Sequence, residues 1–151
     1  MSSIEFESMN AAWSSAWSNK RKALLFATVE DNPWVIQQPT AKQAEFLTSP
    51  ELEVLFGGAA GPGKSTGLLQ AAAQLVEVPR YAALLLRRTY ADLAKPGALM
   101  DRAKEWWMGR GAGWNGTEHK WTFPLGAVVQ FGYLEHDDDR LQYQSSEFQF
   151  V

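Results

Sequence analysis

The pattern of hydrophobic and polar positions changes several times along the chain and predicts alternating strands and helices. Residues 52–56 and residues 81–86 are short apolar runs, which are typical of strands buried in a parallel sheet. Between them, residues 65–77 carry Leu, Ala and Val at helical spacing, and Pro79 follows. We therefore expect a strand–helix–strand unit here, with a helix that Pro79 ends.

The next part of the chain predicts a helix followed by a hairpin. The helix is expected over residues 96–108, with Pro96 in the first turn, where its missing N–H costs no hydrogen bond. It is expected to end at three glycines, Gly109, Gly111 and Gly113. Residues 119–123 and residues 127–134 flank a Pro-Leu-Gly turn. Because apolar and polar residues alternate in the second of these segments, we expect an antiparallel hairpin.

Shorter elements are predicted on either side. Thr40 and Gln43 have the spacing of a capping box, so a short helix is expected over residues 40–47. Further along, residues 137–144 are predicted to form a loop and a short helix, and residues 147–151 a strand.

Residues 1–38 are predicted to form a helical arm, and residues 39–151 an α/β domain. A helix is expected in the arm around residues 9–26, where Trp13 and Trp17 stand one turn apart. This pair of rings contacts either the protein's own core or a partner.

Composition places the chain among globular proteins. Of its 151 residues, 46% are hydrophobic and 21% are charged, which is typical of a domain with its own core. The net charge of -3 argues against a surface that attracts nucleic acid everywhere, although it is compatible with a local basic groove. The absence of cysteine excludes disulfides, zinc ribbons and thiol nucleophiles. No apolar run approaches the roughly 18 residues of a membrane span, so neither secretion nor membrane insertion is expected.

One segment, between the first predicted strand and the first long helix, matches the phosphate-binding pattern G-x-x-x-x-G-K-[ST]. Its residues are Gly58, Ala59, Ala60, Gly61, Pro62, Gly63, Lys64 and Ser65. Glycines let backbone N–H groups turn toward an anion, which the positive end of the following helix also favours. Lys64 is predicted to reach the β and γ phosphates of a nucleotide, Ser65 to bind Mg²⁺, and the N–H of Thr66 to contact the α phosphate. The alternative is a glycine-rich helix N-terminus without a ligand.

Several segments resemble, in order and spacing, the ATPase domain of tailed-phage terminase large subunits, the motors that package viral DNA. They are Gln43, residues 56–65, residues 86–90 and residues 131–134. The resemblance runs from about residue 39 to the last residue and leaves the arm uncovered. It implies a P-loop NTPase-type fold, in which helices flank a mostly parallel sheet with an inserted β-hairpin. It also implies ATP and Mg²⁺ as cofactors.

For the complete protein, the resemblance implies three partners: double-stranded DNA, the portal and the small terminase subunit. It also implies a homo-oligomer, and a phage-encoded protein located in the host cytoplasm. Residues 143–151 resemble the approach to the family's Walker B strand, where an acidic pair holds Mg²⁺ and orients the attacking water. The chain ends before these acids and before the family's nuclease domain. We therefore expect an incomplete domain, truncated at this strand, that binds Mg·ATP weakly and hydrolyses it negligibly.

Two other functions are compatible with the same residues. One is a fragment that binds a nucleotide or a partner without turnover, and the other is a helicase-like P-loop ATPase. The sequence alone therefore does not decide whether the chain is an enzyme.

The candidate catalytic residues are Lys64, Arg87 and Arg88. The two arginines follow a predicted strand at its carboxyl end, where open α/β sheets bind ligands. Either one of them contacts the nucleotide or a DNA phosphate, or both are solvated surface residues. The resemblance implies that Gln43 reads adenine, whereas its spacing favours helix capping, and a side-chain amide is suited to both roles.

For three other sets of residues, a structural interpretation competes with a functional one. The acidic run Asp137, Asp138 and Asp139 predicts a solvated turn rather than a metal site. Four tryptophans are expected to pack in the core or an interface rather than to stack on bases: Trp106, Trp107, Trp114 and Trp121. His119 and His136 lack the spacing of metal ligands.

Overall fold

The structure of the chain is a computed structural model that describes residue 29, residues 31–58 and residues 63–151. The helix predicted around residues 9–26, with its two tryptophans, and the loop residues 59–62 lie outside the described residues.

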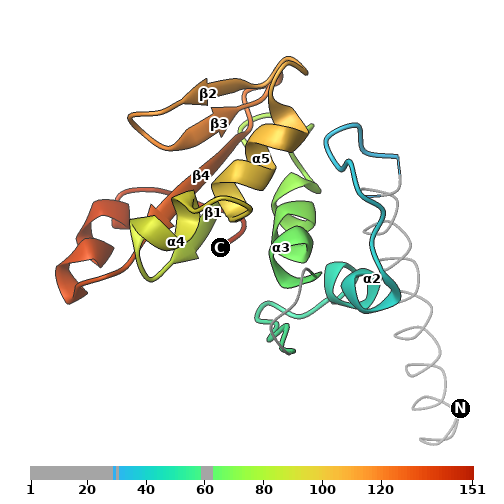
Figure 1. Cartoon of the computed structure of the whole chain (residues 1–151), viewed down its shortest axis with the longest axis horizontal. Coiled ribbons are helices and arrows are strands. Elements are labelled where there is room, and N and C mark those ends of the chain that lie inside the picture. The colour runs from blue at the N-terminus through green and yellow to red at the C-terminus, as the bar shows by residue number, and fades with distance from the viewer. Residues whose placement is uncertain (1–28, 30, 59–62) are drawn as a thin grey trace, which may run out of the picture.

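Four strands of the described chain form one mixed sheet in the order β1-β4-β3-β2 (Figure 1). They are β1 (Ala82–Arg87), β2 (Gly113–Asn115), β3 (Lys120–Thr122) and β4 (Val128–Tyr133). β1 and β4 are parallel, with Arg87 opposite Tyr133, whereas β3 pairs antiparallel with both β4 and β2. The α/β class and the hairpin are confirmed. The sheet is mixed rather than mostly parallel, because β3 makes two antiparallel pairs, one with β4 in the hairpin and one with β2.

Helices flank this sheet. The described ones are α2 (Ala41–Leu47), α3 (Gly63–Ala73), α4 (Tyr90–Ala94), α5 (Leu99–Trp107) and the 3-10 helix η1 (Asp137–Tyr143). α2 packs on α3, and α3 packs on α5 and on β1. In Figure 1, α3 stands between α2 and the sheet. The start of α3 therefore lies where elements from both sides can reach it.

One helix ends, and another begins, at a different residue from the one that the hydrophobic pattern predicts. α3 ends at Ala73, before Pro79, and the side chain of Asn32 donates a hydrogen bond from Nδ2 to the carbonyl oxygen of Ala73 at 2.8 Å. A side-chain donor at this point satisfies a carbonyl that the helix leaves unpaired. α5 begins at Leu99 rather than at Pro96, because the chain first turns at Gly97, which has a φ of +73°.

The strand predicted over residues 52–56 is wrong. Leu52 and Leu55 are solvent-exposed, with exposed fractions of 103% and 97%. The place beside β1, on the side away from β4, is taken by Phe150, which forms a parallel bridge to β1. The expected strand–helix–strand unit is therefore not formed, and the strand predicted over residues 147–151 is reduced to this bridge.

Aromatic rings form the centre of the core. Trp107 of α5 is fully buried, and its ring lies edge-on to those of Trp121 and Phe123, with centroids 5.8 and 5.1 Å away. Its Nε1 donates to the carbonyl oxygen of Trp34 at 3.0 Å, which joins α5 to the segment before α2. The four tryptophans expected to pack in the core do so, with Trp114 half-buried against it.

The described end of the predicted arm packs against the same core. Trp34 and Val35 are buried, and the carbonyl oxygen of Gln37 accepts a hydrogen bond from Nε2 of Gln70 at 2.8 Å. The boundary at residue 38 stays a prediction, while the residues just before it share the core of the domain.

Replacing Trp107 by Ala is expected to lower the free energy of unfolding by about 3–5 kcal/mol, because the change leaves a cavity in the core. Urea denaturation followed by far-UV circular dichroism measures the loss. Met108→Ala is the matched control: this side chain is 58% exposed, and we expect a change within about 0.5 kcal/mol. Equal losses for the two variants would contradict a core centred on Trp107.

Candidate functional site

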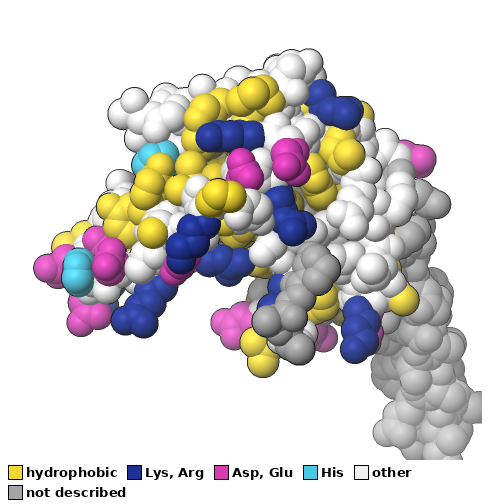
Figure 2. Space-filling view, in the orientation of Figure 1, with side chains coloured by type: hydrophobic (Ala, Val, Ile, Leu, Met, Phe, Trp, Pro, Cys, Tyr) yellow, Lys and Arg dark blue, Asp and Glu magenta, His cyan; other side chains and the backbone are white. Residues whose placement is uncertain are grey.

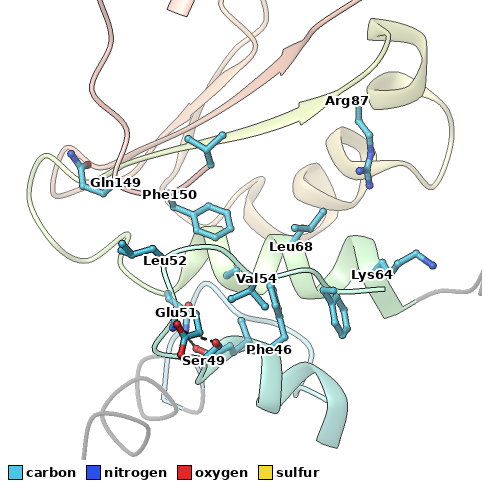
Figure 3. A pocket seen from close by; sticks show the side chains of 15 residues that line it. Phe46, Ser49, Glu51, Leu52, Val54, Lys64, Leu68, Arg87, Gln149 and Phe150 are labelled. Carbon is cyan, nitrogen blue, oxygen red and sulfur yellow. Dashed lines mark hydrogen bonds between the residues drawn. The ribbon is translucent and has the colours of Figure 1, made fainter. Parts of the chain in front are cut away.

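The start of α3 and the carboxyl end of β1 border one cavity of about 480 Å³. Lys64 of α3 and Arg87 of β1 lie at the same end of this cavity, as Figure 3 shows. The rest of its wall is mixed: Phe46, Val54, Leu68 and Phe150 are apolar, whereas Glu51 is acidic and lies at the opposite end from Lys64 in Figure 3. Two cationic residues predicted on separate elements therefore border the same space.

Gln43 connects α2 to the first residue of α3. Its side chain is 2% exposed; Oε1 accepts a hydrogen bond from the N–H of Thr40 at 2.8 Å, and Nε2 donates to the carbonyl oxygen of Gly63 at 2.6 Å. Oγ1 of Thr40 accepts in return from the N–H of Gln43, so the predicted capping box is confirmed. A contact with adenine would require this buried side chain to become accessible to the base, and that role stays a prediction.

Gly67 lets three segments meet beside the loop. A Cβ at this position would lie 3.2 Å from Cε1 of Phe56 and 3.5 Å from Cγ of Gln43. Phe56 in turn stacks on Phe46 of α2, with 4.8 Å between the ring centroids. These contacts fix the chain immediately before and after the loop. A glycine inside a helical pattern does not reveal what packs on it, so Gly67 is not among the predicted site residues.

Lys64 bends back across the loop. Its Nζ donates a hydrogen bond to the carbonyl oxygen of Gly58 at 2.8 Å. Gly58 has a φ of +148°, a conformation that residues with side chains rarely adopt. Ser65 is half-buried in the next position, and Thr66 is 1% exposed. The remaining predicted residues of the motif lie outside the described residues: Ala59, Ala60, Gly61 and Pro62.

Arg102 is a residue of this site that the sequence does not reveal. From α5, its Nη1 donates to Oγ1 of Thr66 at 2.9 Å, and its Nε donates to the carbonyl oxygen of Gly97 at 3.0 Å. Thr66 and Arg102 are 36 positions apart. No local pattern links two residues at that separation, and a basic residue on an amphipathic helix is expected to be solvated.

Arg87 and Arg88 have different surroundings. Arg87 is half-buried and lines the cavity together with Lys64, whereas Arg88 is exposed. The next residue, Thr89, caps α4, since its Oγ1 accepts a hydrogen bond from the N–H of Asp92 at 3.2 Å. Of the two arginines, Arg87 is therefore the one that borders the candidate site.

The acidic run begins the 3-10 helix η1. Oδ2 of Asp139 accepts hydrogen bonds from the N–H groups of His136 and Glu135, each at 2.8 Å. These two bonds, first that from His136, hold the pKa of Asp139 below its ordinary value. Asp137 and Asp138 are solvated as expected, but the run opens a 3-10 helix rather than forming a turn, and Asp139 is half-buried. In the part of the chain that the structure describes, no group of three or more acidic or histidine residues could hold a metal ion.

The charges around the start of α3 fit a polyphosphate. Cationic donors come from three elements in Lys64, Arg87 and Arg102, and the first turn of α3 contains no acidic residue. The N–H groups at a helix N-terminus add a partial charge of about half an elementary charge. For Mg²⁺, this turn offers the hydroxyl of Ser65, and the other ligands would be phosphate oxygens and water.

A comparison of the chain with protein-family models, with curated proteins and with solved structures found no significant match. Of the helices in residues 29, 31–58 and 63–151, none is long and apolar enough to cross a membrane.

Replacing Gln43 by Met is expected to lower the free energy of unfolding by about 1–3 kcal/mol, because the change leaves the N–H of Thr40 and the carbonyl of Gly63 without their buried partner. Chemical denaturation measures the loss. Lys42→Met, at an exposed position of the same helix, is the matched control and should be close to neutral.

A second measurement on Gln43→Met separates capping from adenine reading. If the residue only fixes the start of α3, the ratio of ATP affinity to GTP affinity stays unchanged. A shift in that ratio without loss of stability would contradict the structural role.

Proposed function

We propose that the chain binds the phosphates of ATP at the start of α3 and that it is the ATP-binding portion of a tailed-phage terminase large subunit. One observation carries the phosphate site: Lys64 occupies the first turn of a helix directly after the glycine-rich segment, and its ammonium reaches back to Gly58. That placement is the one in which a P-loop lysine can contact bound phosphates.

Binding would exchange one partner of Lys64 for another. The ammonium now donates to the neutral carbonyl of Gly58, and phosphate oxygens would replace it with charge-assisted hydrogen bonds, which are about twice as strong. The N–H groups of the first turn of α3 would contact the same oxygens, and Ser65 would bind the accompanying Mg²⁺. Arg87, at the same end of the cavity, would add a second cation.

The terminase assignment and its P-loop NTPase-type fold rest on the resemblance in sequence, and the arrangement of the resembling segments supports them. Residues 86–90 and residues 131–134 include the ends of β1 and β4, which lie side by side with Arg87 opposite Tyr133. Arg87 in turn borders the cavity at which α3 begins. The same proposal includes three partners: double-stranded DNA, the portal and the small terminase subunit. It also includes a homo-oligomer and a location in the host cytoplasm.

Replacing Lys64 by Ala is expected to weaken the binding of Mg·ATP by about tenfold or more, because it removes a charge-assisted hydrogen bond to the phosphates. Isothermal titration calorimetry with Mg·ATP measures the change. Lys42→Ala removes the same charge from an exposed position on α2 and should bind as the wild type does.

Two results would contradict the proposal. One is a folded Lys64→Ala variant that binds Mg·ATP as tightly as the wild type. The other is a folded wild-type chain that binds neither Mg·ATP nor inorganic tripolyphosphate.

A further inference from the structure

Arg102 reaches from α5 to the first turn of α3. Its guanidinium donates to Oγ1 of Thr66 at 2.9 Å and to the carbonyl oxygen of Gly97 at 3.0 Å. Thr66 is 1% exposed and lies two positions after Lys64. The guanidinium is thus held between two helices by neutral oxygen atoms and stands next to the proposed phosphate site.

Arg102 is not paired directly with a carboxylate of the described residues. Within the described residues, the ion pairs join Lys95 to Asp92 and Lys120 to Glu118, and Arg102 takes part in neither. Asp101, its neighbour on α5, uses its carboxylate to accept from the N–H of Gly97 at 2.8 Å. Arg102 is also half-buried, which reduces its contact with water.

The position is unfavourable for a cation unless an anion is near. The N-terminus of a helix carries a partial positive charge, so cations are normally found at the other end. The first turn of α3 already contains Lys64 and has no acidic residue. Figure 2 shows further Lys and Arg side chains on this face, over α4 and α5, with Asp and Glu side chains among them. An anion bound at the start of α3 would lower the energy of the whole arrangement.

We propose that Arg102 is a positioning residue for the phosphate site. Its hydrogen bond to Thr66 fixes the first turn of α3, and its charge strengthens the attraction between that turn and bound phosphates. The two hydrogen bonds use two of the five N–H donors of the guanidinium. The group can therefore hold the first turn of α3 and attract phosphate at the same time. This inference rests on the proposed function, since it assumes that α3 binds phosphate.

The competing role is a purely structural brace between α3 and α5. A brace contributes to stability and does not distinguish between ligands of different charge. A positioning residue that also supplies charge affects highly charged ligands more than weakly charged ones. The number of phosphates on the ligand therefore separates the two roles.

The test measures the binding of Mg·ATP, ADP and AMP by isothermal titration calorimetry, with inorganic tripolyphosphate as a probe without a base. Arg102→Gln is expected to weaken Mg·ATP and tripolyphosphate binding by about tenfold, and AMP binding by clearly less. Arg102→Lys should recover part of the loss, because it restores the charge. Arg110→Gln, an exposed arginine beyond the end of α5, is the control for the change in net charge and should bind as the wild type does.

Thr66 provides a second variant that keeps the charge. Thr66→Val removes the hydroxyl that Arg102 contacts, and we expect a loss of about threefold for Mg·ATP and tripolyphosphate and a smaller loss for AMP. Thr66→Ser keeps the hydroxyl and is expected to lose less affinity than Thr66→Val. These variants test the proposal even if Arg102→Gln does not fold.

The outcomes distinguish the two proposals. A wild-type chain that binds neither Mg·ATP nor tripolyphosphate overturns the proposed function. A wild-type chain that binds both, together with an Arg102→Gln variant that binds them equally tightly but unfolds more easily, overturns the role of Arg102 alone. Equal weakening for AMP and Mg·ATP would also reduce Arg102 to a brace.

Discussion

The hydrogen bond from Gln43 to the carbonyl oxygen of Gly63 ties α2 to the first described residue of α3, and the candidate site depends on that connection. Displacing this buried side-chain amide is costly, because the N–H of Thr40 and the carbonyl of Gly63 would then lose their hydrogen-bond partner inside the protein. α2 is therefore held to the first turn of α3 by more than apolar contact. The close approach at Gly67, which brings Phe56 against the same spot, strengthens this connection.

Packing in the core positions the elements on the other side of α3. Trp107 anchors α5 through its ring contacts and through the hydrogen bond to Trp34. Because Arg102 precedes Trp107 on the same helix, the position of the guanidinium beside Thr66 follows from the packing of the core. The parallel pairing of β1 with β4 acts in a similar way on Arg87, which ends β1 at the cavity. The three cations of the site are thus positioned by three separate parts of the fold.

The elements that the sequence predicts correctly are those fixed by local contacts. The capping box depends on Thr40 and Gln43, three positions apart, and the hairpin depends on a turn in which Gly126 has a φ of +87°. The mixed character of the sheet and the loss of the strand over residues 52–56 depend on which segment pairs with β1. That place is taken by Phe150, far along the chain, and an apolar run carries no information about such a competitor.

The candidate site was predictable to a similar extent and for the same reason. A glycine-rich segment followed by Lys64 and Ser65 is a local pattern, and so is an arginine at the end of a strand. The contact between Thr66 and Arg102 could not be predicted, because it joins residues of two helices that meet only in the fold. In the same way, β2 has the residues Gly-Trp-Asn and is too short to give a strand pattern. The capping role of Gln43 follows from its spacing, whereas its bond to Gly63 became visible only in the structure, and adenine reading stays a prediction.

The electrostatics of the site are local rather than a property of the whole surface. The chain has a net charge of -3, yet Lys64, Arg87 and Arg102 lie around the start of one helix. At physiological ionic strength, charges separated by more than about 8 Å of solvent are largely screened from one another. Acidic residues farther away than this therefore do little to cancel the field at the start of α3. The proposed attraction for a polyphosphate would therefore be strongest where three elements bring their cations together.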